Sequence, residues 1–169
     1  MTDWQIERFR PDHLRSHFSC GVTSLDNFIK QLASQYEQRN LGATYVAVSP
    51  NARIVDGYYT MVAGAAPFES MPKELGRKLP RHPVPVVLIA RLAVGRESQG
   101  RLLGEKLLLD SLWRASLLSN DLGIHAALVE AINDKAASFY RKYGFVSLED
   151  QPHRLILPIA KILIPNTVP

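Results

Sequence analysis

The chain has 169 residues, of which 46% are hydrophobic and 21% charged, values typical of a globular protein rather than a disordered, collagen-like or coiled-coil one. No apolar stretch is long enough to span a bilayer, and the N-terminus lacks the basic and apolar regions of a secretory signal. The only cysteine, Cys20, excludes an internal disulfide. We therefore expect a single domain over residues 1–169 in a reducing, cytoplasmic compartment.

Positive charge is concentrated in the middle of the chain, although the whole chain carries only +4. The window from Lys73 to Lys106 holds eight basic and three acidic residues, so its net charge is +5. Such a patch favours a polyanionic partner, either a nucleic acid or a phosphorylated cofactor. A solvated basic face is the alternative reading of the same pattern.

The first third of the chain predicts an edge strand with a loop over 1–19, followed by a helix over 24–39. Thr23 at the N-cap and Asp26 three residues later have the spacing of a capping box. Apolar residues then recur at helical spacing on one face, which consists of Leu25, Phe28, Ile29, Leu32 and Tyr36.

The rest of the chain alternates strands and helices. Runs of β-branched, aromatic or apolar residues predict strands over 44–48, 54–62, 84–94, 125–132, 145–148 and 154–163. Helical patterns predict a short helix near 72–78, a long one over 104–120 and a third over 134–142, which Asn133 caps and Gly144 ends. The tail 164–169 is expected to be a frayed end. This order predicts an α/β domain with one mixed sheet flanked by helices.

One unit suggests a phosphate site. The strand 84–94 leads through a polar, glycine-containing turn into the helix that begins near Gly104. Amides at such a turn, together with the helix dipole, suit a pyrophosphate, and Arg96 and Arg101 add positive charge beside it. The turn has neither the Walker nor the Rossmann glycine pattern, and an ordinary strand-to-helix turn is the equal alternative.

A second unit carries a candidate acid. Phe139 and Tyr143 are four residues apart on the predicted helix and are expected to pack inward. Tyr140 lies about 100° further round that helix, where it could face a cleft. A phenol with a pKa near 10 suits a general acid that protonates a leaving group, although an isolated tyrosine is more often a packing residue.

Two other site classes are not expected. The five histidines are scattered, and the one pair at i, i+4 spacing, His13 and His17, falls in a predicted loop, so we expect no metal site. No serine lies in a Gly-x-Ser-x-Gly motif, which argues against a hydrolase elbow.

Three segments together resemble the GCN5-related N-acetyltransferases. They are Leu88–Val94, Gln99–Gly104 and Ala137–Phe145. Three more segments are similar to the acetyltransferase toxins of bacterial type II toxin–antitoxin modules, namely Phe18–Gly21, Leu25–Phe28 and Thr44–Val46. Each motif is weak alone, but the combination is specific and covers about Cys20 to Pro158.

The resemblance implies a mixed sheet splayed between its fourth and fifth strands, with acetyl-CoA as cosubstrate in the opening. It implies that the strand end pairs with the pantetheine arm and that turn amides hold the pyrophosphate. The implied cofactor-binding residues are Leu92, Ala93, Val94, Gln99, Gly100, Arg101, Leu102, Leu103, Gly104, Glu105, Asn133 and Phe139.

The resemblance also implies the reaction and its partners. Tyr140 would protonate the departing CoA thiolate as the α-amino group of an aminoacyl-tRNA is acetylated, which blocks translation. The implied partners are aminoacyl-tRNA, a ribbon-helix-helix antitoxin through which DNA is bound, and a second copy of the chain, in the bacterial cytoplasm without a membrane. The residues expected to form the basic patch for tRNA are Lys73, Arg77, Lys78, Arg81, Arg91 and Arg96.

One position departs from the family pattern. Aligned on Gln99 and Gly104, a usual glycine of the turn is Leu102 here. If that position requires a positive φ, we expect strain of about 1–2 kcal/mol; if its φ is negative, the leucine is harmless.

The strand 87–94 contains no Asp or Glu, although many N-acetyltransferases have a carboxylate base there. A lysine acceptor, with a pKa of about 10.4, needs such help, whereas an esterified α-amine with a pKa of about 8 or lower is largely neutral already. The sequence therefore favours an α-amine acceptor. An acetyltransferase for protein or small-molecule amines and a non-catalytic, partner-binding regulator are the alternatives.

Overall fold

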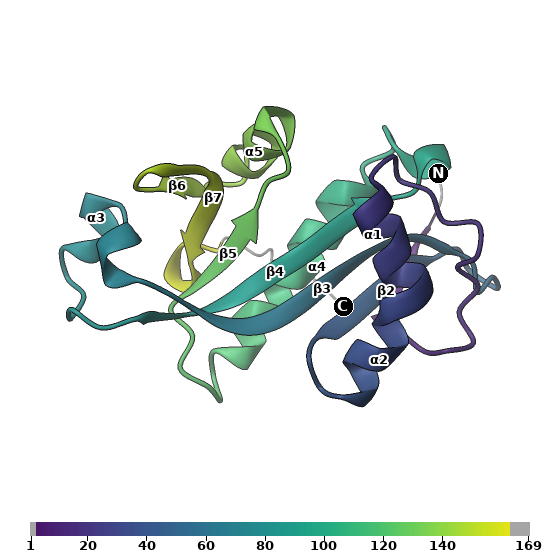
Figure 1. Cartoon of the computed structure of the whole chain (residues 1–169), viewed down its shortest axis with the longest axis horizontal. Helices are drawn as coiled ribbons and strands as arrows, with labels where there is room; N and C mark the ends of the chain where they lie inside the picture. The colour runs from purple at the N-terminus through teal and green to yellow at the C-terminus, as the bar shows by residue number, and fades with distance from the viewer. Residues whose placement is uncertain (1–2, 163–169) are drawn as a thin grey trace. The chain divides into compact units, whose positions relative to one another are not determined.

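The structure is a computed structural model that describes residues 3–162, and it has a mixed α/β architecture (Figure 1). The strands are β1 (Gln5–Arg8), β2 (Ala43–Val48), β3 (Val55–Ala66), β4 (Val84–Val94), β5 (Ala126–Glu130), β6 (Val146–Leu148) and β7 (Gln151–Pro158). The α-helices are α1 (Thr23–Asn27), α2 (Ala33–Gln38), α3 (Lys73–Gly76), α4 (Leu103–Leu118) and α5 (Asp134–Arg141).

Within the described range the strands form one seven-stranded sheet in the order β1-β2-β3-β4-β5-β7-β6. The pairs β1–β2, β2–β3, β5–β7 and β6–β7 are antiparallel, and β4–β5 is parallel. The predicted fold class, an α/β domain with a mixed sheet between helices, is therefore confirmed.

The chain packs as two compact units. One consists of the residues up to Val62 together with Ala90–Ser111, and the other of Ala63–Ile89 together with the residues from Leu112 onward. Residues of β3, β4 and α4 belong to both units because the boundary cuts these elements. The expected single domain over 1–169 stays a prediction.

In the first unit, β1 and β2 pair next to the start of β3, and the helical stretch from α1 to α2 lies along β2 (Figure 1). Their apolar faces form one core, because each strand turns alternate side chains toward the helical stretch. The buried members of this core are Phe9, Phe18, Phe28, Ile29, Ala33, Val46, Val48, Val55, Tyr58 and Ala93.

The predicted helix over 24–39 is confirmed in extent but not in regularity. Between α1 and α2, Phe28–Leu32 is a π-helix. A π turn contains an extra residue, so the buried face advances by one position. As a result Ala33 is fully buried, whereas Leu32, predicted for the core, is 40% exposed.

The capping-box prediction was wrong. The N-cap of α1 is Val22, which has no side-chain capping bond, rather than Thr23. The Asp26 carboxylate instead accepts a hydrogen bond from the backbone amide of Cys20 at 2.8 Å. The helix begins one residue earlier than predicted, and the Asp26 carboxylate holds the segment before it in place.

In the second unit, β4 pairs with β5 over Val86–Ile89 and Ala126–Val129. β6 and β7 form a hairpin, and β7 lies antiparallel to β5 (Figure 1). The buried core of this unit consists of Ala66, Met71, Val84, Val86, Ala126, Leu128, Leu148 and Ile156.

The ends of two strands differ most from those predicted. β3 continues to Ala66, four residues past the predicted end, although its Ala- and Gly-rich end has little strand propensity. The last strand ends at Pro158, which pairs with the first residue of β5, and a 3₁₀ turn follows over Ile159–Lys161. The predicted end of that strand at 163 and the tail 164–169 lie outside the described residues.

Among residues 3–162, no helix is long and apolar enough to cross a membrane.

Candidate active site

The end of β4 presents two different faces. Arg91 and Ala93 point toward the helical stretch: the Arg91 guanidinium carbon lies 3.8 Å from the centre of the Phe28 ring, and Ala93 is buried in the same core. Leu92 and Val94 alternate with them and are half-buried. The sequence-predicted strand end is therefore held rigidly from one side.

The turn after β4 is anchored through its backbone and through one side chain. The Gly95 amide donates to the Asp56 carbonyl at 2.8 Å, and the Arg96 amide to the Ser19 carbonyl at 2.8 Å. The Gln99 side-chain nitrogen Nε2 donates to the carbonyl oxygens of Val94, at 2.9 Å, and of Cys20, at 3.1 Å. Gln99, predicted to bind cofactor, thus fixes the turn.

The turn delivers the chain to α4 with amides oriented outward. Lys106 is the first residue whose amide bonds within the helix, to the Leu102 carbonyl at 3.1 Å. The amides of Leu103, Gly104 and Glu105 therefore have no intrahelical acceptor and point out of the helix N-terminus. The Leu103 side chain is itself 1% exposed, so it fastens the start of the helix to the core.

Two residues of the turn have a positive φ. Gly100 has φ +76° and is exposed. Leu102 has φ +66°, and its side chain is 75% exposed. The left-handed conformation expected for the family's glycine is therefore kept here by a leucine, at a cost of about 1–2 kcal/mol.

Tyr140 lies on α5 in the second unit and is 7% exposed. Its ring contacts Phe139 at 5.3 Å and Phe145 at 5.7 Å between centroids, both edge-on. Burial raises the pKa of its hydroxyl to about 12, so the group stays protonated at neutral pH.

The packing expected for α5 was partly wrong. Phe139 and Tyr143 contact each other as predicted, with centroids 5.3 Å apart, but both are only half-buried. Ala137 and Tyr140 are the buried residues of this helix. The i, i+4 spacing identified a contacting pair, but it gave no indication of which side of the helix faces the sheet.

Asn133 caps α5 as predicted, because its side-chain oxygen accepts from the Ala136 amide at 2.9 Å. Its side-chain NH₂ group remains available as a donor. Next to it, His153 Nε2 lies 2.7 Å from the exposed carboxylate of Asp134, and this hydrogen bond lowers the pKa of Asp134. These contacts fix the first turn of α5.

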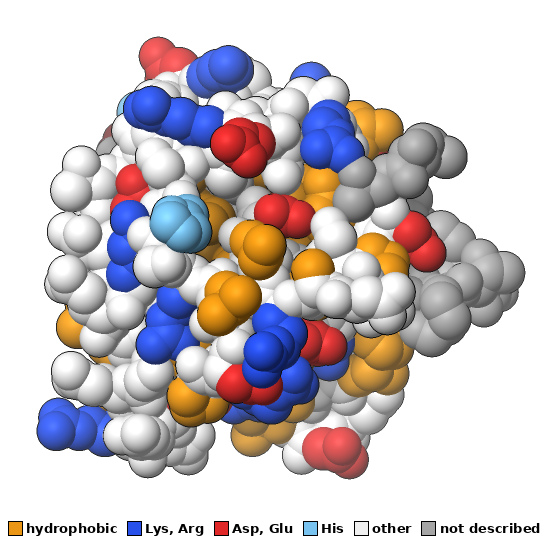
Figure 2. Space-filling model, turned by 90° about the vertical axis from the view of Figure 1, so that its right-hand side faces the viewer, with side chains coloured by type: hydrophobic (Ala, Val, Ile, Leu, Met, Phe, Trp, Pro, Cys, Tyr) orange, Lys and Arg blue, Asp and Glu red, His pale blue; other side chains and the backbone are white. Residues whose placement is uncertain are grey.

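The predicted basic residues are distributed over both units. The four on or beside α3 are all exposed and belong to the second unit: Lys73, Arg77, Lys78 and Arg81. Arg91 and Arg96 belong to the first, where Arg91 is half-buried on the Phe28 ring. On the face shown in Figure 2, lysine and arginine side chains are interspersed with acidic and hydrophobic ones rather than gathered in one field.

A cavity of about 290 Å³ opens beside α3 in the second unit. Its wall combines the half-buried Phe68 ring and the exposed His82 ring with charged side chains and two prolines. The lining residues are Ala65, Ala66, Pro67, Phe68, Glu69, Arg81, His82 and Pro83.

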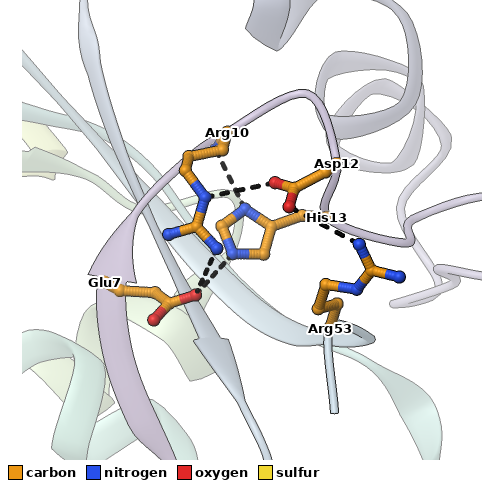
Figure 3. Close-up of polar contacts among 5 residues, drawn as sticks. All are labelled: Glu7, Arg10, Asp12, His13 and Arg53. Carbon is orange, nitrogen blue, oxygen red and sulfur yellow. Dashed lines mark hydrogen bonds and ion pairs between the residues drawn. The ribbon is translucent and has the colours of Figure 1, made fainter.

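His13 belongs to a separate charged network at β1 (Figure 3). Its Nδ1 accepts from the Arg10 amide at 2.9 Å, so Nε2 carries the hydrogen and donates to Glu7 at 2.6 Å. Arg10 also bonds Asp12, which in turn lies 3.6 Å from Arg53. Every polar atom of the His13 ring is engaged within the protein, and no group of three or more His, Cys, Asp or Glu among residues 3–162 is arranged to hold a metal ion.

Sequence reasoning missed the residues that support the turn. Ser19, Cys20 and Asp56 accept its hydrogen bonds, and Trp4 contacts its Arg101 side chain. These residues lie far from the turn in sequence, so no local pattern relates them to it.

Comparison with known proteins gives close matches over most of the chain. A tRNA-acetylating toxin of Mycobacterium tuberculosis is 35% identical over 141 residues, which are 83% of each protein. A protein of Sinorhizobium fredii named "Probable toxin TacT" is 28% identical over 93% of this chain and 92% of its own length. No family model matches the sequence.

Solved structures match the fold at a similar level. AtaT complexed with acetyl-methionyl-tRNAfMet has a TM-score of 0.87 and 28% identity, covering 94% of this chain and 96% of its own. A tyrosine-to-phenylalanine mutant of KacT has the same score and identity, over 93% and 95%. A tyrosine-to-phenylalanine mutant of AtaT, bound to acetyl-CoA and the C-terminus of the antitoxin AtaR, has a TM-score of 0.79 and 25% identity, over 94% of each chain.

Proposed function

Because the chain belongs to the tRNA-acetylating toxins, a family with the GCN5-related N-acetyltransferase fold, we propose that it transfers the acetyl group of acetyl-CoA to the α-amino group of an aminoacyl-tRNA. The 35% identity to the mycobacterial toxin over 83% of both proteins carries this assignment. An acetylated aminoacyl-tRNA no longer has the free amine needed for peptide-bond formation, so translation stops.

In this proposal the first unit binds acetyl-CoA. The β4 end, at Leu92 and Val94, offers backbone groups to the pantetheine arm. The outward amides of the β4–α4 turn hold the pyrophosphate, as a helix N-terminus does for other phosphates. The Gln99 bonds to Val94 and Cys20 support this assignment, because they hold the turn in one conformation.

The chemistry needs an amine nucleophile and a proton donor for the leaving group. The neutral α-amine attacks the thioester carbon, and a proton leaves the nitrogen to water. Tyr140 then donates its hydroxyl proton to sulfur as the C–S bond breaks, so that CoA leaves as the thiol, and the tyrosinate regains a proton from water. Its protonated state at neutral pH supports this role, as do the relatives studied as tyrosine-to-phenylalanine mutants.

The exposed cations beside α3 are the proposed contact for the tRNA acceptor stem, since phosphate contacts account for most non-specific nucleic-acid affinity. The cavity next to these cations is the proposed binding site for the unpaired 3′ end of the tRNA. Phe68 and His82 offer rings on which a base can stack, and Arg81 offers a charge for its phosphate.

The remaining parts of the proposal concern the location and the partners. Aminoacyl-tRNA lies in the bacterial cytoplasm, which places the enzyme there. An antitoxin neutralises it, as AtaR binds AtaT, and DNA is bound through that partner. We further propose that the antitoxin is of the ribbon-helix-helix type and that the toxin is a homodimer.

Incubation with radiolabelled acetyl-CoA and bulk charged tRNA tests the function. Label is expected on tRNA, at the amino acid, and label confined to protein would refute the assignment. Tyr140→Phe should lower the rate by about 10²- to 10⁴-fold, the usual contribution of a general acid. Tyr143→Phe, at a half-buried tyrosine of the same region, is the matched control and should keep the wild-type rate.

A further inference from the structure

Trp4 is buried against the β4–α4 turn of the first unit. Its side chain is 5% exposed, although it lies one residue before β1, near the start of the chain. Lys106, the most distant residue that it contacts, is 102 positions away in sequence. A residue near a terminus is commonly mobile unless it is tied down, and Trp4 is tied down by several contacts.

These contacts converge on two cations, Arg101 in the turn and Lys106 in the first turn of α4. The Arg101 guanidinium carbon lies 5.0 Å from the centre of the Trp4 ring, within cation–π range. The Lys106 ammonium donates to the Trp4 carbonyl oxygen at 2.6 Å. Trp4 therefore fixes one cation that precedes the first residue of α4 in the sequence and one that follows it.

The indole nitrogen of Trp4 also links this residue, through Asp56, to the end of β4. It donates to the Asp56 carboxylate at 3.0 Å, and Ser49 Oγ donates to the same oxygen at 3.3 Å. The Asp56 backbone carbonyl accepts from Gly95, the first residue of the turn, at 2.8 Å. Trp4 thus braces the turn at its beginning and at its end.

The cation–π contact restricts the Arg101 side chain, because its guanidinium carbon is held 5.0 Å from the centre of the indole. A guanidinium carries several N–H donors in a planar arrangement that matches a phosphate. An unrestrained arginine would lose side-chain entropy on binding a phosphate, and the contact with Trp4 removes part of that loss beforehand.

We propose that Trp4 is a positioning residue for acetyl-CoA: it holds Arg101, and with it Lys106, where they meet the phosphate groups of the cosubstrate. The inference rests on the proposed function, because it requires acetyl-CoA at this turn. The phosphate is either the pyrophosphate or the 3′-phosphate, which share the same chemistry.

Titration calorimetry with acetyl-CoA on purified Trp4→Leu and Arg101→Gln tests the proposal. Trp4→Leu removes the ring but keeps the backbone carbonyl that Lys106 uses. We expect about five- to tenfold weaker binding, the size of one partly desolvated cation–π contact. In steady-state assays the KM for acetyl-CoA should rise while kcat and the KM for tRNA stay unchanged.

A double-mutant cycle separates positioning from simple stability. If Trp4 acts through Arg101, Trp4→Leu should have no further effect on affinity in the Arg101→Gln background. Trp4→Phe keeps a ring and should recover part of the affinity. Trp4→Phe also replaces Trp4→Leu in the binding measurements and in the cycle if Trp4→Leu does not fold.

Trp113 provides the matched control, because the Arg114 guanidinium carbon lies 5.3 Å from the centre of its ring. It lies ten residues past Leu103, about 15 Å along α4. Trp113→Leu should therefore leave acetyl-CoA affinity unchanged.

Binding of acetyl-dephospho-CoA identifies the phosphate. If Arg101→Gln lowers the affinity for acetyl-CoA and for acetyl-dephospho-CoA equally, Arg101 contacts the pyrophosphate. If it lowers the affinity for acetyl-CoA alone, Arg101 contacts the 3′-phosphate. Folded variants with wild-type affinity, or additive effects in the cycle, would overturn the inference while leaving the proposed function intact. Failure of the wild type to bind acetyl-CoA would overturn the function itself.

Discussion

The left-handed residue in the turn gives a quantitative test of how the backbone is strained. Leu102 has φ +66° and a side chain that is 75% exposed, so a substitution there removes little packing. For a leucine, this conformation costs about 1–2 kcal/mol relative to a right-handed one. Glycine would remove the cost but loses about 0.5–1 kcal/mol to the entropy of the unfolded chain, which at the midpoints of the two ranges leaves a net gain of about 0.8 kcal/mol.

Three substitutions should therefore fall in a fixed order. Leu102→Gly and Leu102→Asn should both stabilise the protein, because asparagine also tolerates the left-handed region. Leu102→Val should destabilise it, because a β-branched side chain fits that region worst. For a chain of this length, the gain corresponds to a rise in Tm of about 1–4 °C.

Urea and thermal unfolding of the purified variants measure the order. Asn51→Gly is the matched control, because Asn51 has φ +65° in an unrelated turn and already tolerates it. Its stability should change by only a few tenths of a kcal/mol, about the noise of such measurements. Stability that is unchanged in Leu102→Gly and Leu102→Asn, or equal in the glycine and valine variants, would show that Leu102 carries no strain.

Three further outcomes are expected. The kcat/KM for aminoacyl-tRNA should rise with pH to about 8, where the amine becomes neutral, and then stay level to about pH 10, because burial raises the pKa of Tyr140 to about 12; a falling limb in that range would contradict the assignment. Burial also raises the pKa of the Cys20 thiol from 9.0 to about 11, so the folded state holds the proton more tightly than the unfolded chain. That stabilisation is complete below pH 9 and is lost as pH rises toward 11. Between about pH 8 and about pH 10, the free energy of unfolding measured with urea should therefore fall more in wild type than in Cys20→Ala. Gly57→Ala would place a methyl 3.0 Å from Leu107 and 3.1 Å from the Ala93 carbonyl; it should cost about 1–3 kcal/mol by calorimetry, and a neutral effect would show that the packing there yields.

Some elements followed directly from local pattern. The apolar run over 84–94 coincides with β4, and Asn133 caps α5, because strand burial and capping depend on residues close together in sequence. The helix over 24–39 was right in extent, but the π turn that exchanges Leu32 for Ala33 was not visible in the spacing. Pairing of β7 with β5 set the end of the last strand at Pro158, and only the partner strand supplies that limit.

For the turn that the acetyl-CoA proposal requires, the sequence alone determined its place between a buried strand and a helix, and the unusual leucine at its end. The tertiary structure alone decided that Leu102 is left-handed and that Gln99 bonds inward. It also decided that Trp4, Cys20 and Asp56 support the turn. Periodicity and capping act over a few residues and can be read along the chain. The supports come from residues tens of positions away, which meet the turn only after the sheet has formed.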